Sequence, residues 1–161
     1  MILSAQTIRR RIKSPTVDEI IDGPLAINPF CERSVFAGMS FGLSSAGYDV
    51  RIKNEIMLRP GDFILATTVE YVAIPRDLLC KLADKSSWAR RGIAVQNTIF
   101  EPGWRGYPTL EVSNHGRNRV RISAGAPIGQ LLFHMLDYPT EQPYAGKYQD
   151  QPQEPVGACI E

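Results

Sequence analysis

The residues best suited to chemistry lie in one stretch of this 161-residue sequence, between Lys85 and Glu111. It begins with the segment KSSWARRG, in which Lys85, Ser86, Ser87 and Arg90 supply a cation, two hydroxyls and a guanidinium. Together with backbone N–H groups at a helix start, such groups are suited to bind a polyphosphate. The stretch ends on a predicted strand with one carboxylate, Glu111, which is a group able to move protons in hydrolytic reactions.

The same residues also have ordinary structural interpretations. In the predicted strand 107–113 the apolar Leu110 and Val112 point to one face and Glu111 to the other, as for a surface glutamate. The cluster 85–90 equally fits a polar helix start with exposed cations. Residue types alone do not decide between these alternatives.

Composition restricts the kinds of partner. A hydrophobic content of 43% is enough for one domain with a moderate core. The 18 basic and 17 acidic residues give a net charge of +1, so we expect neither nucleic acid nor a membrane as a partner, and any anion site must be local. Because the sequence lacks a membrane-length apolar run and a signal-peptide core, a soluble cytoplasmic protein is expected.

The cysteines and histidines argue against a zinc site. Cys31, Cys80 and Cys159 are odd in number and far apart, which does not fit a disulfide framework. Zinc-dependent cytidine deaminases need a His-x-Glu or Cys-x-Glu and a Pro-Cys-x-x-Cys. The sequence has only His115 and His134 and no C-x-x-C pair. We therefore predict no metal ligands among its side chains, and the zinc-dependent class of enzyme is excluded.

A short amphipathic helix is predicted at the start of the chain. Ser4 is a suitable N-cap, Ile8 and Ile12 lie one turn apart, and Pro15 ends the pattern. We interpret the arginines around them as a solvated face. Residues 16–45 are predicted to form strands and loops.

The rest of the chain has the pattern of a β protein. Predicted strands, separated by Gly and Pro, are 48–52, 63–69, 71–74, 107–113, 120–123 and 128–136, with a turn at 114–118. Their short length and regular spacing indicate an all-β sandwich or barrel. After Pro139 the sequence becomes polar and proline-bearing, so this tail is either disordered or ordered by a ligand or partner.

Five segments resemble, in the same order, the dCTP deaminases, which are metal-independent relatives of the trimeric dUTPases. They are SSAGYDVRI, KSSWARRG, EPGWRGYPTLE, GQLLF and YAGKYQDQ. The resemblance implies a mainly β fold with short helices, a distorted barrel or jelly-roll-like dUTPase-type fold in a homotrimer with sites between subunits. It also implies a β domain over 1–138 and a tail over 139–161 that closes over the nucleotide.

The implied activity is hydrolysis of dCTP to dUTP and ammonia on the route to thymidylate. In this family the glutamate of TLE, here Glu111, shuttles protons, while Ser86 and Arg90 help to orient the water and the glutamate. The implied substrate-binding residues are Lys85, Ser86, Ser87, Trp88, Ala89, Arg90, Glu101, Thr109, Leu110, Glu111, Gln130, Tyr144, Lys147 and Gln151. Mg²⁺ would arrive with the triphosphate, near Asp49, and dTTP is implied as an inhibitor in the same pocket.

Several of these site residues also fit an ordinary structural role. Asp49 fits a strand-edge or turn carboxylate, Gln130 an amide bonded to backbone, and the tail a frayed terminus. Trp88 and Trp104 are more typical of packing residues.

The sequence is also compatible with two other functions. A bifunctional enzyme would deaminate dCTP and then cleave dUTP to dUMP and pyrophosphate. Glu101 counts against it, because relatives usually carry aspartate there and a shift of ~1 Å in a catalytic group can cost on the order of a hundredfold in rate. A binding protein that senses nucleotides without turnover is the second alternative.

Overall fold

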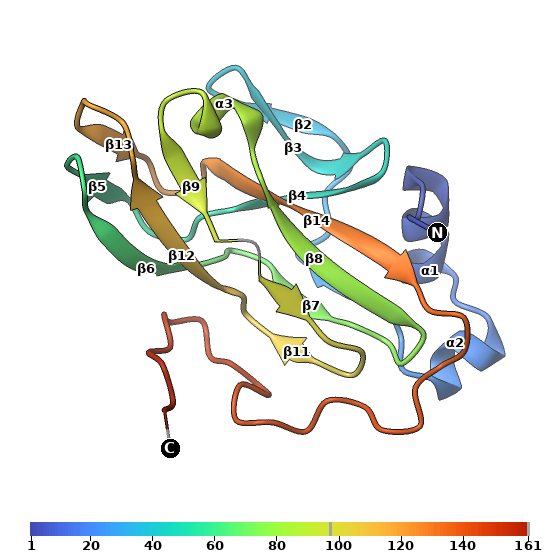
Figure 1. Cartoon of the computed structure of the whole chain (residues 1–161). Helices are drawn as coiled ribbons and strands as arrows, with labels where there is room; N and C mark the ends of the chain where they lie inside the picture. The colour runs from blue at the N-terminus through green and yellow to red at the C-terminus, as the bar shows by residue number, and fades with distance from the viewer. Residues whose placement is uncertain (97, 161) are drawn as a thin grey trace.

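The computed structural model describes residues 1–96 and 98–160 (Figure 1). Asn97 and Glu161, which belong to the predicted site stretch and to the predicted tail, lie outside the described residues. Within these ranges, no helix has the length and apolar character needed to cross a bilayer.

The strands form four sheets, which confirms the prediction of a mainly β protein. The largest sheet has the order β10-β8-β14-β4-β3-β2, with bounds Ile99–Phe100, Leu78–Asp84, Pro127–Met135, Gly47–Arg51, Met39–Ser44 and Ser34–Phe36. A second sheet contains β6 (Phe63–Thr67), β12 (Thr109–Asn114) and β9 (Ile93–Val95). The smaller sheets contain β1 (Ala26–Asn28), β7 (Tyr71–Ala73) and β11 (Arg105–Gly106), and β5 (Ile56–Leu58) with β13 (Val120–Ile122). The described strands do not close into a single barrel.

The central strands of the two main sheets build the core. β14 pairs antiparallel with both β8 and β4, and β12 pairs antiparallel with both β6 and β9. Leu110 and Val112 are fully buried, as the alternation along strand 107–113 predicts. Trp88 and Trp104 are also buried, which confirms their prediction as packing residues.

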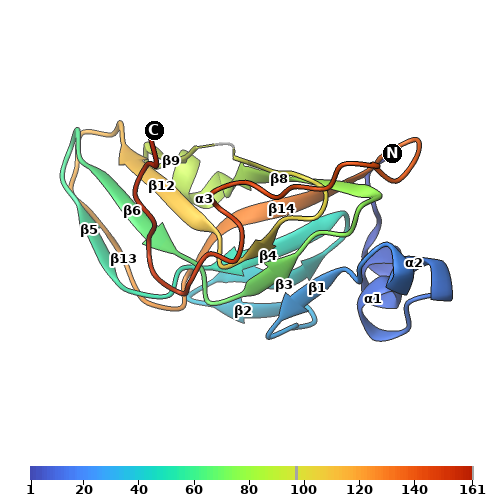
Figure 2. The same cartoon turned by 90° about the horizontal axis from the view of Figure 1, so that it is seen from below.

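The two longer helices lie together at one end of the β body, and the C-terminal tail runs across another side (Figures 1 and 2). α1 (Ala5–Lys13) follows Ser4, which has extended N-cap geometry but makes no side-chain capping bond. α2 (Val17–Ile21) was missed by the prediction of strands and loops for residues 16–45. A capping box starts it: Thr16 Oγ1 accepts from Glu19 N at 3.3 Å, and Glu19 Oε2 accepts from Thr16 N at 2.8 Å.

The prediction of a solvated arginine face on α1 is wrong for Arg11. Its side chain is only 2% exposed, and its guanidinium donates to both carboxylate oxygens of Asp77 at 2.8 and 2.7 Å. Arg9 and Arg10 do lie at the surface, where they pair with glutamates. Arg11 differs because α1 packs this turn against the loop that precedes β8.

An Asp77→Ala variant should lose about 3 kcal/mol of unfolding free energy, because it leaves the buried Arg11 charge without its main partner. Urea unfolding at fixed protein concentration measures the difference. Glu141→Ala is the matched control, since Glu141 is exposed and has no ion pair among those seen in the described residues. Equal stability of the two variants would contradict a stabilising role for the pair.

Candidate active site

The first pocket, called here the lysine pocket, lies at the end of the central sheet where β4, β14 and β8 meet. Its volume is about 320 Å³, and it is lined by Arg33, Ser40, Leu43, Ser44, Ser45, Asp49, Asp84, Lys85, Ser86 and Gln130. Asp49 of β4 lies directly across from Gln130 of β14, which lies across from Ala83 of β8. Strand register thus brings together three segments that are far apart in the sequence.

Polar contacts fix the side chains of the lysine pocket. Lys85 Nζ donates to Asp49 Oδ2 at 2.9 Å, and both side chains are largely buried. Gln130 Nε2 donates to the Ser44 hydroxyl at 2.7 Å. Gln130 is therefore a mid-strand residue with a side-chain partner, and the alternative of an amide bonded to backbone is wrong. The pocket offers hydroxyls, the Lys85 ammonium and the Arg33 guanidinium as donors to an anion, beside the carboxylates of Asp49 and Asp84.

The segment that carries Asp49 is anchored on both sides. Arg51 donates from its backbone N and its Nε to the two oxygens of Glu70, at 2.9 and 2.7 Å. Burial raises the pKa of Glu70 above its ordinary value despite this pairing. The Tyr48 hydroxyl accepts from Cys31 N, and burial likewise raises the pKa of Tyr48.

The helix α3 (Ser86–Ala89) follows the lysine pocket directly. Trp88 anchors it, because its ring is buried and its Nε1 donates to Pro127 O at 2.6 Å. Ser87 and Arg90 are exposed at the surface. The Arg91 guanidinium lies 5.2 Å from the centre of the Trp88 ring, which gives this residue a packing contact.

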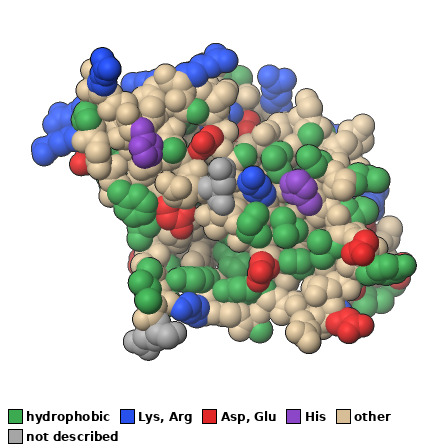
Figure 3. Space-filling model, in the orientation of Figure 1, with side chains coloured by type: hydrophobic (Ala, Val, Ile, Leu, Met, Phe, Trp, Pro, Cys, Tyr) green, Lys and Arg blue, Asp and Glu red, His purple; other side chains and the backbone are tan. Residues whose placement is uncertain are grey.

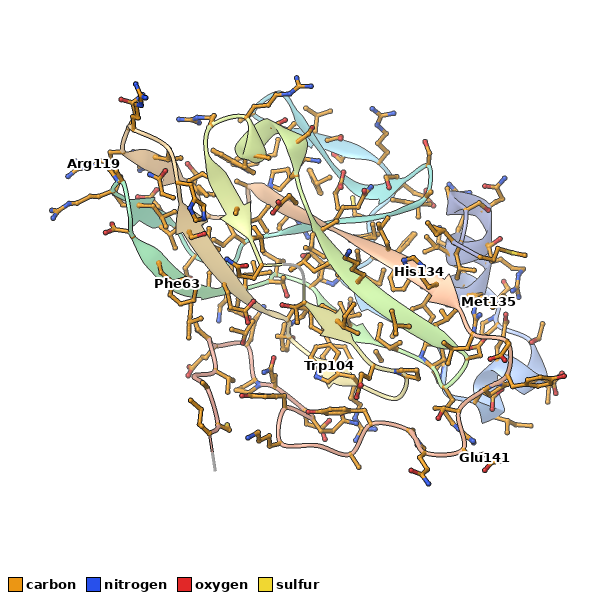
Figure 4. The ribbon with its side chains drawn as sticks, viewed as in Figure 1. Phe63, Trp104, Arg119, His134, Met135 and Glu141 are labelled. Atoms are coloured by element: carbon orange, nitrogen blue, oxygen red, sulfur yellow. The ribbon has the colours of Figure 1, made fainter. Side chains whose placement is uncertain are left out.

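The second pocket, called here the glutamate pocket, has a volume of about 470 Å³. It is lined by Phe63, Leu65, Thr98, Ile99, Phe100, Glu101, Trp104, Thr109, Glu111, Tyr144, Tyr148, Gln151, Val156, Gly157 and Ala158. Figure 3 shows a hollow between the tail and the strands above it, lined largely by hydrophobic side chains. Phe63 and Trp104 lie on the side of the sheets that faces the tail (Figure 4). Most of the lining is apolar.

Glu111 is fixed in the middle of β12, between β6 and β9. Its carboxylate accepts a hydrogen bond from Thr98 Oγ1 at 3.0 Å. Its carbonyl accepts from Gln96 N at 3.0 Å. A half-buried carboxylate held this way at the wall of an apolar pocket is placed for proton transfer to a bound ligand.

The C-terminal tail forms one wall of the glutamate pocket and has partners within its own chain. Trp104 Nε1 donates to Tyr148 O at 2.7 Å, Tyr107 N to Gln151 O at 3.0 Å, and Val156 N to Thr109 Oγ1 at 3.1 Å. A Cβ on Gly103 would lie 2.6 Å from Pro143 Cβ, so a glycine is needed where the tail crosses this loop. Lys147 points its ammonium at the carbonyl of Cys159.

The structure divides the predicted site residues into three groups. The lysine pocket contains Lys85, Ser86, Gln130 and the Asp49 carboxylate. The glutamate pocket contains Glu101, Thr109, Glu111, Tyr144 and Gln151. Ser87, Trp88, Ala89, Arg90, Leu110 and Lys147 line neither pocket. The two pockets share no lining residue, and α3 and the tail lie on opposite sides of the domain (Figure 1).

Some lining residues were missed by sequence reasoning. Thr98 and Phe100 belong to the stretch between the two motifs, where nothing in the sequence marks them. Ser44 reaches the lysine pocket through the pairing of β3 with β4, and Arg33 lies directly before β2. Ser44 and Ser45 had a signal, since they begin the segment SSAGYDVRI, and Trp104 and Tyr148 lie in two of the other segments. Among the described residues, no cluster of three or more His, Cys, Asp or Glu side chains is arranged to hold a metal ion.

Solved structures of dUTPases share the fold. The native dUTPase of EIAV superposes with a TM-score of 0.58 at 20% identity, covering 76% of this chain and 98% of the other. A variant dUTPase from phage phi11 of S. aureus gives 0.57 at 14% identity, over 76% and 97% of the two chains, and its structure was described for the coordination of a structural Mg(II) ion. The predicted dUTPase-type fold is confirmed.

Comparison of the sequence identifies the family within this fold. The profile of the dCTP deaminase-like family matches residues 46–136. The dCTP deaminase of Acidobacterium capsulatum is 39% identical, over 78% of this chain and 86% of that protein. The dCTP deaminase of Campylobacter fetus is also 39% identical, over 78% and 85%. The chain belongs to the dCTP deaminase family.

Proposed function

We propose that this chain catalyses the hydrolytic deamination of dCTP to dUTP and ammonia in the cytoplasm, as a step in pyrimidine deoxynucleotide synthesis. The observation that carries the proposal is Glu111, a carboxylate held at the wall of a largely apolar pocket of about 470 Å³. A pocket of this volume and lining accommodates a pyrimidine ring. The names of the relatives support the same substrate.

In the proposed mechanism Glu111 removes a proton from a bound water, and the resulting hydroxide attacks C4 of cytosine. Glu111 then delivers that proton to N3 of the ring. The hydroxyl proton at C4 passes through the carboxylate to the exocyclic amino group, which leaves as ammonia, and C4=O forms. Ser86 and Arg90 orient the water and the glutamate.

Ser86 and Arg90 would meet Glu111 across a subunit interface. Within one chain, Ser86 lines the lysine pocket and Arg90 lies on the surface beyond α3, whereas Glu111 lines the other pocket. A complete site therefore needs the lysine pocket of one copy against the glutamate pocket of another. A homotrimer with three equivalent interfaces meets this requirement.

The triphosphate would bind at the lysine pocket. Lys85, the hydroxyl of Ser86 and the amide of Gln130 are donors suited to phosphate oxygens, and the exposed Ser87 follows them on α3. The carboxylates and hydroxyls here also fit a hydrated Mg²⁺, since hard cations prefer oxygen ligands, and Asp49 would hold it through water. When bound, the ion neutralises part of the phosphate charge. An inhibitory dTTP would use the same donors.

The tail would close the site over bound nucleotide. Tyr144 and Gln151 already line the glutamate pocket, and Lys147 would turn from Cys159 toward the phosphates. Closure excludes water other than the reacting molecule, which strengthens the electrostatic contacts inside.

One observation favours the bifunctional enzyme as a second candidate. Glu101 lines the same pocket as Glu111, so two carboxylates face one ligand. One could serve deamination while the other activates water for cleavage of dUTP to dUMP and pyrophosphate.

The test measures ammonia release from dCTP, CTP and dCMP, and pyrophosphate release from dCTP and dUTP. We expect ammonia from dCTP at a kcat/KM at least about a hundredfold above the values for CTP and dCMP, because those lack a deoxyribose or two phosphates. Pyrophosphate from dUTP would establish the bifunctional enzyme. Nucleotide binding without either product would identify a sensor instead.

A further inference from the structure

We propose that Thr98 is a positioning residue for Glu111. The Thr98 hydroxyl can form a hydrogen bond with the Glu111 carboxyl group in both of its protonation states. The inference rests on the proposed deamination, in which Glu111 repeatedly gains and loses a proton. Its basis is the pair of acceptors around one hydroxyl. Thr98 Oγ1 lies 3.0 Å from Glu111 Oε2 and 3.3 Å from the carbonyl oxygen of Gln96.

The backbone around Thr98 is held by strands on both sides. Leu82 N of β8 donates to Thr98 O at 2.9 Å, and Gln96 N donates to Glu111 O at 3.0 Å. Ile99, the next residue, pairs with Lys81 of β8. Thr98 is thus tied to the central sheet, and the Gln96 carbonyl is tied to the strand that carries Glu111. The three groups therefore keep their relative positions without a ligand.

A hydroxyl has one proton to donate and two lone pairs to accept with. While Glu111 is ionised, the Thr98 proton points to its carboxylate, which is the shorter and charge-assisted bond. After Glu111 has taken a proton from water, its O–H can donate to Thr98 Oγ1. The Thr98 proton then rotates to the Gln96 carbonyl.

No net proton moves through Thr98 in this exchange. The O–H bond of threonine is never broken, and only its direction changes. The benefit lies in the apolar lining of the pocket, where a carboxyl group that loses its partner in one state would destabilise that state. Thr98 would keep Glu111 in one rotamer through the whole cycle, facing C4 of the base.

The variants Thr98→Val and Thr98→Ser separate the hydroxyl from the shape of the side chain. Thr98→Val keeps the volume and removes the hydroxyl, so kcat for ammonia release from dCTP should fall on the order of tenfold to a hundredfold. KM should stay within about twofold, because the triphosphate donors are untouched. Thr98→Ser restores the hydroxyl and should recover kcat to within about threefold of wild type.

Thr7→Val is the matched control, since Thr7 is a half-buried threonine of α1 whose hydroxyl lies 3.2 Å from that of Ser4 and which lines neither pocket. It should leave kcat and KM unchanged. Thr98→Ala serves as a second hydroxyl-free variant if Thr98→Val does not fold, and should show the same loss of kcat.

Three outcomes overturn the proposal: wild-type kcat in the hydroxyl-free variants, a loss confined to KM, or a serine variant as slow as the valine variant. Each of these is measured with a wild-type enzyme that deaminates dCTP, so each leaves the proposed function intact. A wild-type chain that releases no ammonia from dCTP would overturn the proposed function, and the role of Thr98 with it.

Discussion

A Glu111→Gln variant is expected to release ammonia from dCTP on the order of a thousandfold more slowly than the wild-type chain. Glutamine keeps the length of the side chain and can still accept the Thr98 hydrogen bond, but its amide cannot take a proton from water. The reaction needs two proton transfers through this carboxylate, the first from water to N3 and the second from the C4 hydroxyl to the leaving amino group. An amide at this position therefore stops both transfers while the pocket keeps its shape.

Binding distinguishes lost chemistry from a damaged site. Titration calorimetry with dTTP, which has no amino group to lose, should give a Kd for Glu111→Gln within about threefold of the wild-type value. Glu55→Gln is the control, because Glu55 pairs with Arg121 at the surface and lines neither pocket. Wild-type turnover by Glu111→Gln would rule out the shuttle and leave Glu101 as the other carboxylate in the pocket.

The sequence was sufficient to predict those features of the structure that depend on residues close together in the chain. Alternation along 107–113 predicted the burial of Leu110 and Val112, because successive side chains in any strand point to opposite faces. The capping box of Thr16 and Glu19 is equally local. A Thr followed three residues later by a Glu is a signal for a helix start, and it marks the beginning of α2.

Other features could not be predicted from the sequence, because they depend on contacts between residues far apart in the chain. Arg11 is buried because Asp77, 66 residues away, lies beside α1, and no local pattern contains that pairing. The division of the site into two pockets has the same origin. It depends on β14 pairing with β4 and β8, which brings Asp49 and Gln130 to Lys85 and leaves Glu111 on another sheet. A motif match identifies these residues but not which of them share a pocket.

That division leads to a second large effect, which appears when two inactive variants are combined. Arg90→Ala should lose on the order of a hundredfold or more in kcat, because the guanidinium that orients water and glutamate is absent. Glu111→Gln is inactive for a different reason. If the two residues act from different subunits, mixed oligomers contain some sites in which an intact Arg90 faces an intact Glu111. In a trimer that contains both variants, one of the three interfaces joins an intact Arg90 to an intact Glu111, so the mixed trimers should recover about a third of wild-type activity.

The recovery is measured on oligomers purified through two different affinity tags, one on each variant, so that only mixed assemblies are assayed. The control combines Glu111→Gln with Ser86→Ala and Arg90→Ala on the same chain. Its mixture with wild-type chains should contain active sites, whereas its mixture with Glu111→Gln should contain none, since no subunit then supplies Glu111. Mixed Arg90→Ala and Glu111→Gln oligomers without activity would mean that both side chains serve one site from the same chain. In that case α3 would have to approach β12 within a single subunit, against the separation of the two pockets seen here.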